Sequence, residues 1–228
     1  MAQLTYLDIV NKVLVKLRET KVNSVDYTKY SALIGAFVND AKKEVESAYT
    51  WQALRTGVNF TSVIGQREYD LTIETTEDSR LLYDEFGRPM VFDLTPGNEF
   101  QLKERTHDYV ETQFRLQYPT QTQTQPCIFS LRQAGEGFIF TFLEAPLEAR
   151  DYLAYFCVPQ EELANGTDTI KVPWRPVRDL ALVYALDERG EEIGEPGNMA
   201  EVRYRNSLAD AIAMDSLGSK FRTDFVVQ

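Results

Sequence analysis

Histidine and cysteine are scarce in this sequence: its 228 residues include one histidine, His107, and two cysteines, Cys127 and Cys157. A catalytic triad would have to use His107, which stands beside Asp108 in a polar segment, so a surface histidine is the favoured interpretation. A histidine-rich zinc site is excluded, and no Cys-x-x-Cys pair is present. Both cysteines stand in apolar, strand-like surroundings, which predicts buried thiols in a reducing compartment rather than a disulfide.

Other common signatures are missing as well. No glycine-rich phosphate loop followed by Lys-Ser or Lys-Thr occurs, and the Gly135-x-Gly137 motif is too short for a dinucleotide fingerprint. No apolar run approaches the roughly 20 residues that a membrane helix needs. The N-terminus lacks the basic start and apolar stretch of a signal peptide. We therefore expect a soluble protein made in the cytoplasm, with no catalytic residue, no cofactor and no metal.

Positive charge is in short supply, with 24 Lys and Arg against 35 Asp and Glu and a net charge of −11. A surface of that sign repels phosphate, which argues against a protein that reads nucleic acid. Two alternatives remain: an acidic wall past which nucleic acid slides, and simple solubility. The carboxylates between Asp187 and Glu201 could bind a divalent cation, but they lack calcium-loop spacing. A solvated connection between helices is the favoured interpretation of that run.

The ends of the chain have the apolar spacing of helices. Apolar residues three and four apart predict one long helix over residues 27–55, roughly 40 Å in length at about 1.5 Å per residue. The apolar stripe of so long a helix needs other helices or neighbouring subunits to cover it. Further helices are expected at residues 5–18, 176–190 and 197–217, the first with Asp8 as a capping-box acid and the second with Pro176 at its first position.

The middle of the chain has the pattern of strands. Two hairpins are expected, one over residues 58–71 and one over residues 80–94, each with a turn that contains glycine. The clearest strands are residues 127–132, 138–143 and 151–158. Their bulky residues alternate little, so these strands are buried on both sides or face a partner.

These elements predict an α+β fold: a helical bundle of N-terminal and C-terminal helices with an inserted antiparallel β module. The expected domains are residues 1–56 with 173–218 for the bundle, 57–172 for the β-rich domain and 219–228 for a C-terminal tail. Apolar residues in a terminal peptide are often disordered. Phenylalanines four residues apart before a Val-Val pair also suit a peptide that docks into a partner's groove. The docking residues would be Phe221, Arg222, Phe225, Val226 and Val227.

Several stretches together resemble the head-to-tail adaptor (connector) proteins of tailed bacteriophages. Their order and spacing match across most of the chain, outside residues 74–125. The stretches are residues 6–14, 37–45 and 49–51 in a helix pair that ends near a tryptophan, 65–71 at the end of a hairpin, 140–146 and 152–156 in strands, and Val-Pro-Trp-Arg-Pro at 172–176 before a helix that reaches 188–190.

The resemblance implies a structural virion protein at the head–tail junction, assembled in the host cytoplasm. Such adaptors form a homo-oligomeric ring, typically of twelve subunits, beneath the portal protein. The ring extends the DNA channel, through which DNA passes without specific binding, and offers a platform to a downstream tail or tail-completion protein. The C-terminal segment often reaches the portal, which fits the expected tail.

Within such a ring, the polar side of the long helix is expected to lie at a subunit interface, with Asn39, Lys43, Glu46 and Trp51 as its residues. Two other functions stay open at this point. The protein could be a tail-tube or tail-completion protein lower in the tail. It could also be a glycan hydrolase with two facing carboxylates, although nothing in the sequence positively indicates an enzyme.

Overall fold

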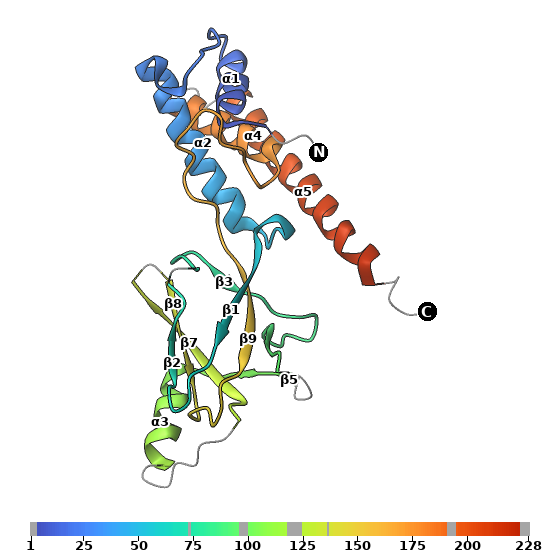
Figure 1. The fold of residues 1–228 in the computed structure, drawn as a ribbon. Coiled ribbons are helices and arrows are strands. Elements are labelled where there is room, and N and C mark those ends of the chain that lie inside the picture. Colours follow the sequence, from blue (N-terminus) through green and yellow to red (C-terminus); the bar gives the residue numbers. More distant parts are fainter. Residues whose placement is uncertain are drawn as a thin grey trace. The chain divides into compact units, whose positions relative to one another are not determined.

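The computed structural model describes residues 4–72, 74–95, 100–117, 125–135, 137–190 and 195–223. The chain forms two compact units: a helical unit of Met1–Leu54 with Gln160–Gln228, and a β-rich unit of Arg55–Pro159. Figure 1 shows helices in the first unit and two small sheets in the second, so the expected α+β class is confirmed. Residues 160–172, expected in the β-rich domain, belong to the helical unit instead.

The helical unit is built from both ends of the chain. Fully buried apolar residues of three helices, α1 (Tyr6–Lys16), α2 (Lys29–Ala48) and α4 (Trp174–Glu188), form the core. They are Ile9, Val10, Val13, Ile34, Val38, Ala41, Val45, Val177, Ala181 and Ala185. Its elements are α1 (Tyr6–Lys16), the short 3-10 helices η1 (Val25–Tyr27) and η2 (Gln52–Leu54), α2 (Lys29–Ala48), α4 (Trp174–Glu188) and α5 (Glu195–Thr223).

Helix starts follow the predicted capping chemistry. The Thr5 side chain accepts from the Asp8 backbone N–H and the Asp8 carboxylate accepts from Thr5, which confirms the expected capping box of α1. Helix α4 begins at Trp174, so Pro176 is its third residue rather than its first. Proline is tolerated there because first-turn N–H groups have no partner within the helix.

Helix α2 is shorter than predicted. It has 20 residues, starts after the capping residue Thr28, and ends at Ala48 because Tyr49 is extended, so its length is about 30 Å. The apolar spacing continues past its end, since Trp51 and Leu54 are buried, but these residues follow in a turn and a 3-10 helix. The Trp51 indole N–H donates to the Val45 carbonyl at 2.7 Å and closes the helix end.

The β-rich unit contains two packed sheets. One has strand order β1-β9-β4-β5 with β3 also paired to β9, and the other has order β2-β8-β7-β6. Helix α3 (His107–Gln117) lies against the second sheet at β7 and β8. The strands are β1 (Arg55–Thr61), β2 (Glu68–Asp70), β3 (Arg80–Leu81), β4 (Val91–Asp93), β5 (Phe100–Gln101), β6 (Lys103–Glu104), β7 (Ile128–Ala134), β8 (Gly137–Phe142) and β9 (Asp151–Cys157).

One expected hairpin is wrong. Strand β1 pairs along its length with β9 and strand β2 pairs with β8, so the segment over residues 58–71 crosses from one sheet to the other. Aromatic burial explains the crossing, because Phe60 of β1 and Tyr69 of β2 meet between the sheets with ring centroids 5.3 Å apart. Strands β7 and β8 form an antiparallel hairpin. Strand β6 runs parallel to β7, so the second sheet is mixed rather than antiparallel.

Aromatic side chains fill the space between the two sheets. The Phe60 ring stacks on Tyr152 of its own sheet at 5.4 Å and contacts Phe140 of the other sheet at 5.0 Å. Phe129 and Phe140 stack at 4.7 Å. The expected burial of bulky residues on the clearest strands is therefore met inside this unit for Phe140, Phe142, Tyr152 and Phe156, each of which is fully buried.

A buried ion pair fixes the edge of this core. The Arg150 guanidinium donates to the Asp93 carboxylate at 2.9 Å, and their side chains are 7% and 0% exposed. Burial on its own would raise the pKa of Asp93, but hydrogen bonds from Thr95, Arg150 and Gln125 outweigh it and hold that pKa below its ordinary value. Arg150 also forms an ion pair with the exposed Glu148, so removing Asp93 leaves the guanidinium with that weaker partner, whereas removing Arg150 leaves the Asp93 carboxylate buried without a cation.

Asp93→Asn is expected to lower the free energy of unfolding by about 2–3 kcal/mol near pH 7, because it leaves the buried Arg150 with the exposed Glu148 as its carboxylate partner. The folded pKa of Asp93 is depressed, so its stabilisation is complete above the unfolded value of about 4 and is lost as pH falls through the folded pKa. The gap between wild type and variant should therefore shrink on acidification in urea denaturation followed by circular dichroism.

The control for that experiment is Asp151→Asn. Asp151 is exposed and accepts one hydrogen bond from the Thr61 hydroxyl at 2.7 Å, so its loss should cost about 1 kcal/mol or less. Equal losses for the two variants would contradict the role given to the buried pair.

Candidate interaction surfaces

The polar side of α2 binds residues 160–172, here named the strap. The Asn39 side chain donates to the Leu163 carbonyl at 3.1 Å and accepts from the Leu163 N–H at 3.0 Å. The strap also pairs with the start of α1, where the Tyr6 N–H donates to the Asp168 carbonyl at 2.7 Å. The polar face that is expected at a subunit interface therefore holds, at Asn39, a segment of the same chain.

A buried ion pair lies beneath the strap. Lys42 and Glu46 are one helical turn apart on α2, with Nζ and Oε2 separated by 3.3 Å and side chains 3% and 2% exposed. The ammonium also donates to the carbonyls of Gln160 and Glu161, at 2.5 and 3.1 Å. Burial lowers the pKa of Lys42 and raises that of Glu46, while their mutual attraction opposes both shifts.

The four residues expected at a subunit interface have different surroundings. Asn39 binds the strap, Glu46 is buried beneath it and Trp51 is buried at the end of α2, whereas Lys43 is exposed. Exposed carboxylates flank Lys43 at Asp40 and Glu44. The expectation that this side of α2 meets a neighbouring subunit stays a prediction, and its accessible part is the exposed row around Lys43.

Helix α5 is a second candidate surface. It has 29 residues and packs against α4, yet among residues 198–216 only Ala200 is buried. Large apolar side chains are exposed along it at Met199, Val202 and Met214. Near its end, the Asp215 carbonyl accepts from the Gln52 side chain at 2.7 Å and its carboxylate accepts from the Gln52 N–H at 3.2 Å.

The expected docking peptide begins inside this helix. The backbone of Phe221 and Arg222 is helical, because α5 runs to Thr223 rather than ending at residue 217. Phe225, Val226 and Val227 lie outside the described residues. Residues 219–223 therefore continue α5, with no break at Gly218.

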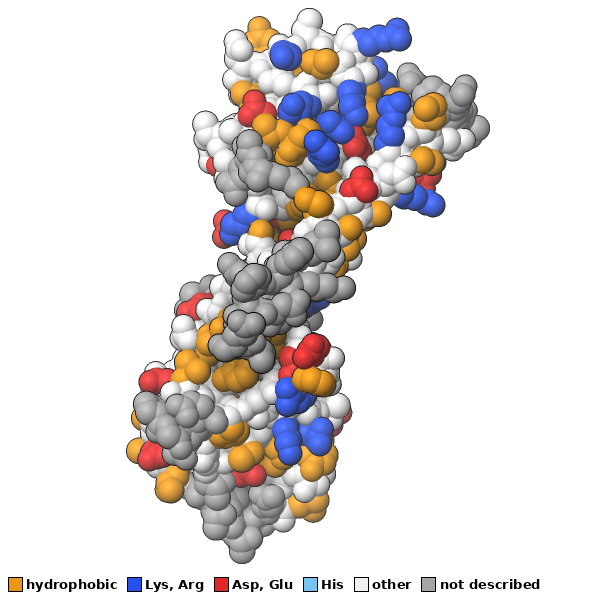
Figure 2. Space-filling model, turned by 90° about the vertical axis from the view of Figure 1, so that its right-hand side faces the viewer, with side chains coloured by type: hydrophobic (Ala, Val, Ile, Leu, Met, Phe, Trp, Pro, Cys, Tyr) orange, Lys and Arg blue, Asp and Glu red, His pale blue; other side chains and the backbone are white. Residues whose placement is uncertain are grey.

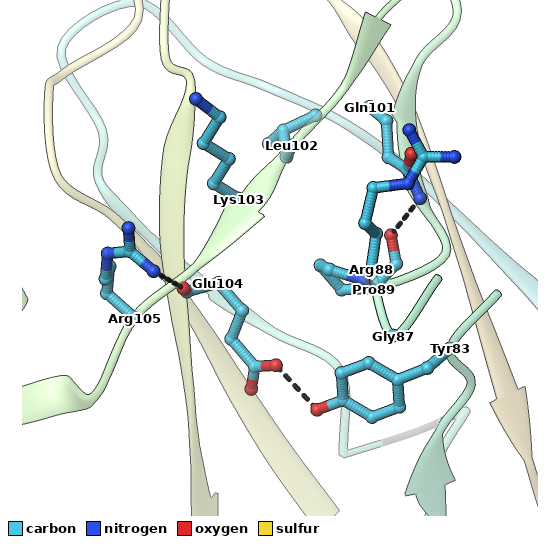
Figure 3. A pocket seen from close by; sticks show the side chains of 9 residues that line it. All are labelled: Tyr83, Gly87, Arg88, Pro89, Gln101, Leu102, Lys103, Glu104 and Arg105. Carbon is cyan, nitrogen blue, oxygen red and sulfur yellow. Dashed lines mark hydrogen bonds between the residues drawn. The ribbon is translucent and has the colours of Figure 1, made fainter. Parts of the chain in front are cut away.

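The β-rich unit contains an open pocket of about 420 Å³ (Figure 3). On one side of it the Tyr83 hydroxyl donates to the Glu104 carboxylate at 2.6 Å, and on another the Gln101 amide donates to the Pro89 carbonyl at 2.8 Å. Burial and the Glu104 carboxylate raise the pKa of Tyr83 to about 12. Both charge signs line the pocket, which suits it to a polar side chain of a partner more than to a specific anion or cation. Its lining residues are Tyr83, Gly87, Arg88, Pro89, Gln101, Leu102, Lys103, Glu104 and Arg105.

The residues considered for chemistry are dispersed. His107 is half-buried, with Nδ1 3.4 Å from the Ser130 hydroxyl, and Cys127 is exposed while Cys157 is buried, so the expected burial of both thiols is wrong for Cys127. In the described part of the chain, no three His, Cys, Asp or Glu residues come together as a metal site. Of the acidic run, Glu191 and Glu192 lie outside the described residues. No helix in the described ranges is long and apolar enough to cross a membrane.

Glu46→Gln is expected to lower the stability of the helical unit by about 3 kcal/mol, because the buried Lys42 ammonium loses its carboxylate partner. Both tryptophans belong to this unit, so their fluorescence during urea denaturation reports its unfolding. Asp40→Asn, on the exposed side of the same helix, is the matched control and should change stability by about 0.5 kcal/mol or less. A Glu46 variant as stable as this control would contradict the tie between α2 and the strap.

The comparison with known families agrees with the motifs in the sequence. The profile of the family described as SU10 adaptor protein matches residues 4–224, which is nearly the whole chain. No curated protein shows significant similarity to it. The family match is consistent with a phage head-to-tail adaptor and confirms the resemblance drawn from the first helices, the strands and the Val-Pro-Trp-Arg-Pro motif. The chain belongs to the SU10 adaptor protein family and is a bacteriophage adaptor protein.

Proposed function

We propose that this chain is the head-to-tail adaptor of its virion and forms a homo-oligomeric ring, typically of twelve copies, below the portal protein. The ring extends the DNA channel and presents a platform to the next tail or tail-completion protein. DNA passes through it without specific binding, and the protein acts as a structural component rather than an enzyme. Membership of a phage adaptor family supports the general role.

The observation that carries the proposal is helix α5. Most surface helices of globular proteins bury an apolar stripe against their own domain. In α5, by contrast, only Ala200 is buried among residues 198–216, and Met199, Val202 and Met214 are exposed. A surface helix of this kind marks a site for protein partners. Its C-terminal end leads directly into the apolar tail, so the helix and the tail together form a continuous docking element.

Helix α5 is attached to the rest of the helical unit at Asp215, ahead of the docking residues. Two hydrogen bonds between Gln52 and Asp215 attach the helix near Asp215 to the turn after α2. The residues after Asp215 extend past this anchor and carry Phe221 and Arg222, followed by Phe225, Val226 and Val227. We assign portal binding to these five residues, since a helical start lowers the entropy lost when a peptide docks.

Two truncations test this assignment. A chain that ends at Thr223 loses Phe225, Val226 and Val227 and should bind the portal of the same phage at least about tenfold more weakly, as expected when apolar anchor residues are removed. A chain that ends at Gly218 loses all five docking residues and should not bind. Affinity is measured by co-purification and by titration with purified portal.

The fold of both truncated chains is the control. Each keeps Asp215 and its bonds to Gln52, so thermal unfolding followed by tryptophan fluorescence should match the full chain. Full portal binding by the Gly218 truncation would reject the docking tail. Co-purification of the full chain with tail components but never with the portal would place the protein lower in the tail.

A further inference from the structure

Three basic side chains gather around Trp174 at the junction of α1 and α4, and Lys16 joins them through the carboxylate of Asp179. We name them the basic patch: Lys12, Lys16, Arg175 and Arg178. The Lys12 ammonium and the Arg178 guanidinium each lie 5.1 Å from the centre of the Trp174 ring, and the Arg175 guanidinium lies 5.7 Å from it. Figure 2 shows a group of Lys and Arg side chains on one face of the helical unit.

The patch has a large excess of positive charge. Asp179 is its buried carboxylate and accepts from both Lys16, at 2.9 Å, and Arg178, at 2.6 Å. Neither Lys12 nor Arg175 has a carboxylate within ion-pair distance among the described residues. Four cations against one carboxylate leave a local charge of +3 in a chain whose net charge is −11.

The geometry holds these charges at fixed positions. Trp174 is the first residue of α4 and is half-buried, so its ring is a rigid surface for the flexible Lys and Arg side chains. The side chains of Lys16 and Arg178 are held a second time by Asp179. A fixed group of cations loses little entropy when it binds an acidic partner, which favours a specific contact.

The acidic partner is provided by the chain itself. Four exposed carboxylates, here named the acidic strip, lie on α2 and at the other end of α4: Asp40, Glu44, Asp187 and Glu188. The Tyr184 hydroxyl donates to Glu44 at 2.5 Å and joins the two helices there. The basic patch lies at the first turns of α4, whereas Asp187 and Glu188 lie in its last turn and Glu44 of α2 meets Tyr184. Exposed Lys43 and Arg189 stand beside the strip, so four carboxylates against two cations leave it negative.

We propose that the basic patch of one copy binds the acidic strip of the next copy, which makes the patch half of a head-to-tail subunit interface. Such a heterologous contact generates a closed ring when its rotation closes. A nucleic-acid partner is disfavoured because the net charge of −11 repels phosphate around a patch of this size. The inference rests on the proposed ring and identifies the surfaces that build it.

Charge reversal tests both halves of the interface. The first variant, Lys12→Glu with Arg175→Glu, changes the two patch cations that lack a carboxylate partner among the described residues. The second, Asp40→Lys with Asp187→Lys, changes two strip residues. Glutamate near the start of α4 and lysine near its end both suit the helix dipole, so both variants should fold. Self-association is measured by analytical ultracentrifugation at low ionic strength, alone and in the presence of the portal.

Each variant alone should lose self-association by at least about tenfold. The first leaves the patch with two cations and three carboxylates, facing the negative strip, and the second leaves the strip, with Lys43 and Arg189 beside it, with four cations and two carboxylates, facing the positive patch. An equal mixture of the two should recover it, since each interface in an alternating ring again joins opposite charges. Misfolding cannot produce this recovery.

The control variant, Lys21→Glu with Lys29→Glu, makes the same change of charge outside the patch and should associate like wild type. Added salt should weaken the association of the wild-type chain.

Other outcomes overturn the inference. If the first variant assembles like wild type, or if the mixture fails to associate while the control does, the patch is not a subunit interface. If wild type binds duplex DNA and the first variant does not, the patch is a phosphate site. If the wild-type chain forms no ring on the portal, the proposed function itself is rejected. If the wild-type chain forms rings and the two variants form them equally well, only this inference is rejected.

Discussion

The helical unit depends on the contacts of one buried group, the Lys42 ammonium. It meets one carboxylate, Glu46, and two carbonyls of the strap, so a charge that would be costly alone becomes the centre of a satisfied polar group. Through it, α2 fixes the path of the chain where it returns at Gln160 to the helical unit. The positions of α4 and α5 follow from that return, because the strap leads directly into Trp174. A purely apolar α2 face could not have specified where residues 160–172 lie.

How far the sequence predicts this fold depends on which physical signal each element carries. Capping and apolar spacing were sufficient for α1, and apolar spacing alone predicted α4, whose N-cap makes no side-chain hydrogen bond and whose start lies two residues before the predicted one. The end of α2 could not be predicted in the same way, since Trp51 continues the apolar spacing after the backbone has turned. The hairpin expected over residues 58–71 failed for a related reason. Strand pairing there is decided by aromatic contacts between residues far apart in sequence, such as Phe60 with Tyr152.

The interaction surfaces were predictable only in part. Exposure of Lys43 follows from the helical pattern, but the same pattern places Glu46 and Asn39 on a polar side without indicating that the strap covers it. The Tyr83–Glu104 pocket joins segments whose spacing has no recurring motif. The patch around Trp174 joins residues more than 150 positions apart, Lys12 with Arg175 and Arg178, so only the packing of α1 on α4 reveals it. The contacts that the sequence did not predict all join side chains that are distant in sequence.

For the proposed ring, charge offers a way in which one acidic chain both repels DNA and binds copies of itself. A uniform net charge of −11 would keep subunits apart at low ionic strength as effectively as it keeps phosphate away. Local reversal of sign resolves the conflict, because Coulomb attraction between a +3 patch and facing carboxylates acts within about one Debye length, roughly 8–10 Å, while the remaining surface stays repulsive. The attraction is therefore limited to one orientation of two copies. A ring built in this way can present acidic walls to DNA without losing contact between its subunits.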